Sequence, residues 1–250
     1  MALKKLTSGA ALAAIMLTAG GAHATILTVY DDFDGGLINF NNTVAAAGGT
    51  ATHDNWLNLP SGTSIARPDY TITQNDGSFM NPSVYTLWSS SPSRTTSGDV
   101  VSIDPYGPSG SGHGTGDGSL SKPSGVTLTF TSAINSIGFE VGDWATCCQV
   151  SDLYISFDNG APIRVGHSTT FGDGFLTNNG AGVFVAAFDD SGDFTTVQFW
   201  GDGYGEVLNF GGTVHYAKLN QGSLPVPEPA SLALMGLGLA GIGMARRKKA

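Results

Sequence analysis

Glu140 and Glu206 are the carboxylates best placed for acid–base chemistry, since the remaining glutamate, Glu228, lies close to the C-terminus. Glycosidic bond hydrolysis needs two carboxyl groups that face each other across a cleft. These two glutamates belong to separate motifs, and no compact acidic signature surrounds them. Side chains alternate along a strand, which places Glu140 on the outer face of its sheet. We therefore expect no catalytic residues and keep a hydrolase that uses Glu140 and Glu206 as the alternative.

Aspartates form the densest groups of potential metal ligands. Calcium prefers carboxylate and carbonyl oxygens, and two aspartate clusters offer them, although neither has EF-hand spacing. The alternative role of these aspartates is to cap turns. His53, His113, His167 and His215 are scattered in the sequence, which argues against a zinc site. The calcium candidates are Asp31, Asp32, Asp34, Asp189, Asp190 and Asp193.

Aromatic side chains are the candidates for sugar binding, because their flat faces can stack on sugar rings. Trp200 ends a predicted strand and is followed by a glycine-rich loop that carries Asp202 and Tyr204. Trp144 follows another strand. Burial in the core is the alternative for each tryptophan. We therefore predict a ligand-binding group of Trp144, Trp200, Tyr204 and Asp202.

Cys147 and Cys148 are adjacent, and they are the only cysteines of the chain. Consecutive Cα atoms lie about 3.8 Å apart, which is less than the usual separation across a disulfide, so a vicinal bridge would be strained. Such a bridge would make the loop after Trp144 rigid. Free thiols and intermolecular bridges are the alternatives.

Short apolar segments separated by turn residues recur through the middle of the chain. Among 20 acidic residues 17 are aspartates, and together with 36 glycines they disfavour helices. We expect strands at residues 26–30, 70–73, 84–88, 100–103, 126–131, 137–141, 153–157, 163–165, 183–188, 195–200 and 214–218. The sequence predicts an all-β fold, an antiparallel two-sheet sandwich of jelly-roll type, over residues 25–220.

The N-terminal 24 residues have the three parts of a secretory signal peptide. Lys4 and Lys5 precede an apolar run, which ends at the small-residue triplet from Ala22 to Ala24. The run is too short to span a bilayer. We expect cleavage after Ala24 and export of the chain.

The C-terminal tail follows a short linker, residues 221–225, and also has three parts. Val226, Pro227, Glu228 and Pro229 precede an apolar segment, residues 232–245, expected to form a helix. A basic cluster closes the tail and would stay on the cytoplasmic side of the membrane. This cluster is formed by Arg246, Arg247, Lys248 and Lys249.

This tail resembles the PEP-CTERM sorting signal of Gram-negative, biofilm-forming bacteria. The resemblance implies recognition by an exosortase, transient insertion into the inner membrane and association with exopolysaccharide production. Similar tails are also labelled as the C-terminal domain of ice-binding proteins (the ice-binding protein C-terminal domain label). This label describes the tail and says nothing about binding of ice. Ice binding would need a flat, regular array of threonines. Only the threonines of residues 71–73 and 127–131 hint at such an array.

The body between the two tails is strongly acidic. It carries five basic and 19 acidic residues, a net charge of −14, which argues against nucleic acid as a partner. Residues 137–219 resemble the β-sandwich bodies that accompany PEP-CTERM tails and share the architecture of carbohydrate-binding modules. We therefore expect an exported, non-catalytic protein of the cell envelope, cell surface or extracellular matrix that associates with exopolysaccharide.

Overall fold

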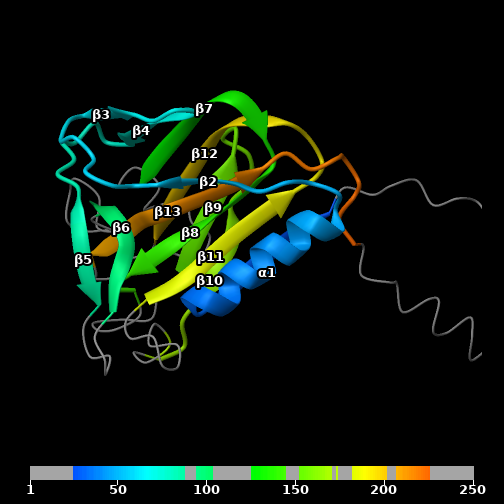
Figure 1. The fold of residues 1–250 in the computed structure, drawn as a ribbon, viewed down its shortest axis with the longest axis horizontal. Coiled ribbons are helices and arrows are strands. Elements are labelled where there is room, and N and C mark those ends of the chain that lie inside the picture. The colour runs from blue at the N-terminus through cyan, green and yellow to red at the C-terminus, as the bar shows by residue number, and fades with distance from the viewer. Residues whose placement is uncertain are drawn as a thin grey trace, which may run out of the picture.

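The computed structural model describes residues 25–87, 94–103, 125–144, 152–170, 173, 182–201 and 207–225. One sheet contains β1 (Ile26–Asp31), β2 (Thr52–Asn55), β5 (Ser83–Leu87), β6 (Arg94–Ile103), β8 (Ser136–Gly142), β11 (Gly182–Asp189) and β13 (Leu208–Ala217). The other contains β3 (Ser64–Ala66), β4 (Tyr70–Gln74), β7 (Val126–Ile134), β9 (Asp152–Phe157), β10 (Ile163–His167) and β12 (Phe194–Gly201). Helix α1 (Phe33–Ala46) lies along β11 on the outside of the first sheet (Figure 1).

Three pairs of consecutive strands, β3–β4, β5–β6 and β9–β10, are neighbours in the sheets, and the other pairings join strands that are distant in the chain. The seven-stranded sheet runs β1-β11-β8-β13-β6-β5, and β2 pairs with a second part of β13. The six-stranded sheet runs β10-β9-β12-β7-β4-β3. Every strand pairing in the described segments is antiparallel. The predicted all-β, two-sheet fold is therefore confirmed.

Each of the eleven predicted segments overlaps a strand of the structure. The prediction missed β2, β3 and α1. Strand β2 consists of Thr52, His53, Asp54 and Asn55, and it has no apolar alternation to mark it. Its place in the sheet comes instead from pairing with β13. The proposed boundaries of the signal peptide, body, linker and sorting tail stay predictions.

The main core lies between the two sheets and follows the period-2 alternation of their strands. In β7, Val126, Leu128 and Phe130 point into this core, as predicted. In β8, Ile137, Phe139 and Val141 do the same from the opposite sheet. The residues between them occupy the outer faces of the two sheets. Outward side chains of the seven-stranded sheet can therefore lie beside α1.

Helix α1 begins at a capped aspartate and buries one face on the outer side of the seven-stranded sheet. The Asp32 carboxylate accepts a hydrogen bond from the Gly35 backbone N–H at 2.7 Å, which satisfies one free donor of the first turn. Phe40 packs on Phe188 of β11, with ring centres 5.1 Å apart. Gly36 allows close approach, because a Cβ atom there would lie 2.5 Å from the Cβ of Phe184. A second, smaller core therefore joins helix and sheet.

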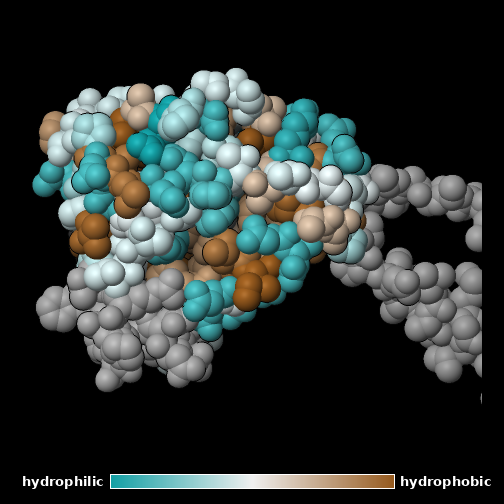
Figure 2. All heavy atoms as spheres, viewed as in Figure 1, coloured by the Kyte–Doolittle hydropathy of each residue, from teal (hydrophilic) through white to brown (hydrophobic). Residues whose placement is uncertain are grey.

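The outer surface on the α1 side is mixed in polarity. Hydrophobic groups alternate with hydrophilic ones over this face and form no single large apolar patch (Figure 2). Among the described residues, no helix combines the length and the apolar character needed to cross a membrane. The predicted apolar helix of the tail, residues 232–245, lies outside the described residues.

Candidate functional site

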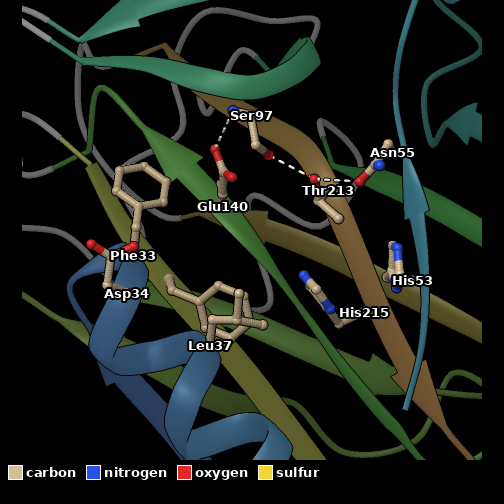
Figure 3. A pocket seen from close by; sticks show the side chains of 10 residues that line it. Phe33, Asp34, Leu37, His53, Asn55, Ser97, Glu140, Thr213 and His215 are labelled. Carbon is tan, nitrogen blue, oxygen red and sulfur yellow. Dashed lines mark hydrogen bonds between the residues drawn. The ribbon is translucent and has the colours of Figure 1, made fainter.

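A cavity of about 290 Å³ opens between the first turns of α1 and the outer face of the seven-stranded sheet (Figure 3). Its volume is close to the lower limit for pockets that hold small ligands. Polar and apolar side chains from six elements line it. They are Phe33, Asp34, Leu37, His53, Asn55, Ser97, Glu140, Phe184, Thr213 and His215. We call this cavity the helix pocket.

Strand alternation places Glu140 in the helix pocket. Its neighbours Phe139 and Val141 point into the main core, so Glu140 lies on the outer face of β8, as the sequence indicates. The side chain is only 6% exposed because the pocket walls surround it. One carboxylate oxygen of Glu140 accepts a hydrogen bond from the backbone N–H of Ser97 at 3.0 Å.

Strand β2 supplies two further pocket residues, and Asp54 between them fixes their orientation. The Asp54 carboxylate accepts hydrogen bonds from the Tyr70 hydroxyl at 2.7 Å and from the Arg67 Nε at 2.8 Å, on the inner side of the strand. Its neighbours His53 and Asn55 therefore point to the outer face. There they meet residues of β13, in register with Thr213 and His215.

Hydroxyl and amide groups form a chain of hydrogen bonds along the pocket. Thr213 donates to the Asn55 side-chain oxygen at 2.9 Å, so its single hydroxyl proton is committed. The Ser97 hydroxyl, 2.7 Å from the Thr213 oxygen, must then donate to it. These contacts hold three polar side chains from β2, β6 and β13 in place (Figure 3).

The structure brings His53 and His215 together, which sequence spacing did not predict. The two residues are direct partners across β2 and β13, and their ring centres lie 5.9 Å apart. His215 also contacts Phe184 and Phe40, at 5.9 and 6.0 Å. Burial lowers the pKa of His215 to about 4, and the nearby His53 adds to this effect. His215 is therefore neutral at pH 7.

Trp144 and Trp200, two predicted ligand-binding residues, are fully buried in the structure. Trp144 meets Tyr30 edge to face, with ring centres 5.5 Å apart. Trp200 stacks on Tyr154 at 5.7 Å. Neither indole therefore offers an open face for a sugar ring. Both have the position that was the alternative for each tryptophan, which is burial in the core. Their predicted partners Asp202 and Tyr204 lie outside the described residues.

The aspartates predicted to bind calcium make hydrogen bonds within the protein. Asp32 caps α1, and Asp31 accepts a bond from the Asn39 amide at 3.1 Å. Asp190 is 1% exposed and accepts bonds from the backbone N–H groups of Thr25 and Leu224, both at 2.7 Å.

The other aspartates of these clusters are placed as follows. Asp189 accepts a bond from the Ser191 N–H at 3.0 Å, and Asp193 pairs with Lys218 at 2.5 Å. Asp34 lines the helix pocket. In the described part of the chain, no group of three or more His, Cys, Asp or Glu side chains is arranged to hold a metal ion. Asp32 and Asp189 therefore cap a helix and a turn, the alternative role weighed for these residues, and the calcium site stays a prediction.

Several predicted residues lie outside the described residues, and the predictions for them stand unchanged. These are Ala22, Ala24, Cys147, Cys148, Glu206, Val226, Pro227, Glu228, Pro229, Arg246, Arg247, Lys248 and Lys249. Sequence reasoning identified Glu140 among the pocket residues but missed its neighbours from β2, β6 and β13. No local pattern marks those neighbours, because strand pairing alone brings them together.

Comparison with known proteins identifies the class of signal at the end of the chain. Residues 225–249 match the PEP-CTERM protein-sorting motif. The chain therefore carries the sorting signal of an exported protein that an exosortase processes, and its destination is the cell envelope or surface. No curated protein matches the chain significantly.

Proposed function

We propose that this exported protein is a non-catalytic component of the cell envelope or matrix that associates with exopolysaccharide through the helix pocket. The observation that carries the proposal is the pocket itself, in which amide, carboxylate and imidazole groups converge beside apolar walls. Ligand pockets combine apolar lining with a few well-placed polar groups in this way. The sorting signal supports the proposal, since it directs the protein to the surface where such polymers lie.

The chemistry of the helix pocket suits an uncharged sugar unit. Sugar hydroxyls both donate and accept hydrogen bonds, and Asn55, His53 and Glu140 supply complementary groups. Phe33 and Leu37 provide apolar surface for the C–H groups of a ring. The volume of about 290 Å³ favours one sugar unit over a long stretch of chain. Because the body carries a charge of −14, a neutral or cationic polymer is favoured over an anionic one.

Exchange of Asn55 for alanine tests the role of the pocket. We expect Asn55→Ala to weaken retention on the host's exopolysaccharide about two- to tenfold, the effect of losing one hydrogen bond of about 0.5–1.5 kcal/mol. Asn81→Ala is the matched control. Asn81 is also exposed and also accepts one hydroxyl hydrogen bond, from Ser61 at 2.7 Å. Equal retention of both variants and wild type would argue against the helix pocket as the binding site.

A polysaccharide hydrolase is the second candidate, because the buried carboxylate of Glu140 lies in the helix pocket. Its predicted partner Glu206 lies outside the described residues. Reducing ends released from the polymer by wild-type protein, and lost in Glu140→Gln, would favour the hydrolase. Binding without released ends supports the non-catalytic proposal.

A further inference from the structure

The imidazoles of His53 and His215 lie opposite each other on paired strands, and the hypothesis of polysaccharide binding uses only His53, as a hydrogen-bonding group. Directly opposite residues in an antiparallel ladder have Cβ atoms about 4.5–5.5 Å apart, so both side chains rise side by side from the sheet. Figure 3 shows the two rings next to each other on β2 and β13, and their planes differ by 35°. Two imidazoles on adjacent, paired strands form a more rigid unit than two on a loop.

The spacing of the two rings allows both to touch one ion. Zinc binds imidazole nitrogen at about 2.0–2.1 Å with tetrahedral geometry, which places two coordinated ring centres about 5 Å apart. The observed separation of 5.9 Å is slightly longer than this, so the His53 ring must turn toward His215 to share an ion with it. His53 is exposed, so its ring can rotate, and an ion can enter from solvent.

Acidic side chains lie close to the pair of histidines. Glu140 and Asp34 line the same pocket and contribute negative charge. The pocket volume leaves space for water molecules around an ion.

We propose that His53 and His215 bind one divalent transition-metal ion of the zinc, copper or nickel class, with water in the remaining coordination positions. Imidazole suits these ions, whereas calcium and magnesium prefer oxygen ligands. A site with two protein ligands and bound water is open to exchange with solvent. Its two ligands are not members of the aspartate clusters, although Asp34 of one cluster lines the same pocket, and its existence does not depend on polysaccharide binding.

Titration of the tag-free, full-length protein with zinc chloride tests the proposal. Free thiols are alkylated first, because Cys147 and Cys148 would otherwise compete for the ion. We expect one ion per chain at pH 7.5. His53→Ala should weaken zinc affinity at least tenfold, and His215→Gln should do the same. Calcium chloride should produce no histidine-dependent binding.

His167→Ala is the matched control for these titrations. His167 is half exposed on β10 of the other sheet and bonds to Asp152 at 2.6 Å. Its exchange should leave zinc affinity unchanged. Circular dichroism of each variant confirms the fold, and copper-induced broadening of histidine ring signals in NMR gives a second measurement. Zinc affinity that is equal in wild type and His53→Ala, or broadening that spares both pocket histidines, would overturn the proposal.

Discussion

At the scale of single residues, His215 links the stability of the protein to pH. Burial lowers its pKa from 6.5 to about 4, with a further contribution from His53. In the unfolded chain the same ring would titrate near 6.5. Between these two values the unfolded state binds more protons than the folded state, so acidification favours unfolding. Below about pH 4 both states are protonated at this residue, and the effect stops growing.

We therefore expect the free energy of unfolding to fall as the pH is lowered from about 6.5 to about 4. One proton gives a slope of at most about 1.4 kcal/mol per pH unit, and partial exposure of the ring keeps the slope below that bound. Urea denaturation in the presence of a chelator, at four pH values across this window, measures it. His215→Gln should show a shallower slope. Identical pH profiles for wild type and variant would contradict this role of His215.

At the scale of elements, β13 holds the helix pocket together. It pairs with β8, β6 and β2, and its register against β8 shifts between Gly211 and His215. Gly211 and Gly212 have φ angles of 135° and 69°, values that residues with side chains rarely adopt. A Cβ atom on Gly212 would lie 2.8 Å from a carboxylate oxygen of Glu140. The irregularity therefore makes room for Glu140 and brings Thr213 and His215 into the pocket.

Exchange of Gly211 for alanine should destabilise the protein strongly. A Cβ atom there would lie 2.4 Å from the indole ring of Trp56, so both backbone strain and a clash with a buried side chain follow. We expect a loss of about 2–5 kcal/mol in thermal or urea unfolding. Gly77→Ala is the control, since Gly77 has a φ of 77° but no atom within 4 Å of its added Cβ. That variant should lose only about 1–2 kcal/mol. Equal losses would show that packing against Trp56 does not matter.

At the scale of the whole molecule, the chain combines a β-sandwich body with a sorting tail. The body has its own two-sheet core, while the tail match covers residues 225–249 alone. From its prolines, the sequence predicts an extended motif ahead of the apolar segment. The sorting signal therefore lies outside the two-sheet core, while the proposed binding site lies on the body.

Replacement of Pro227, Glu228 and Pro229 by alanine should block sorting without blocking export. We expect the variant to accumulate in the inner membrane, measured by cell fractionation, because the exosortase no longer recognises its motif. Cleavage after Ala24, checked by N-terminal sequencing, serves as the control for translocation. A wild-type distribution between membrane, cell surface and medium would contradict the sorting role.

Much of the fold could be predicted because its strands have a local signature. Alternating residues such as Leu128 and Thr127 indicate which face is buried, and clusters of Asp, Asn and Gly indicate turns. Helix α1 also has a sequence signal: Asp32 can cap it, and apolar Phe33, Leu37, Phe40 and Val44 follow at helical spacing. The Gly35-Gly36 pair weakens this indication of a helix, since glycine disfavours helices.

The sequence by itself determined the fold class, the sorting tail and the outward face of Glu140, because composition, motif order and alternation are local properties of a chain. Only the tertiary structure decided which side chains meet. His53 and His215 became neighbours through the pairing of β2 with β13, and Trp200 became a core residue stacked on Tyr154. Pairing between distant strands depends on the packing of the whole sandwich, and no short stretch of sequence encodes it.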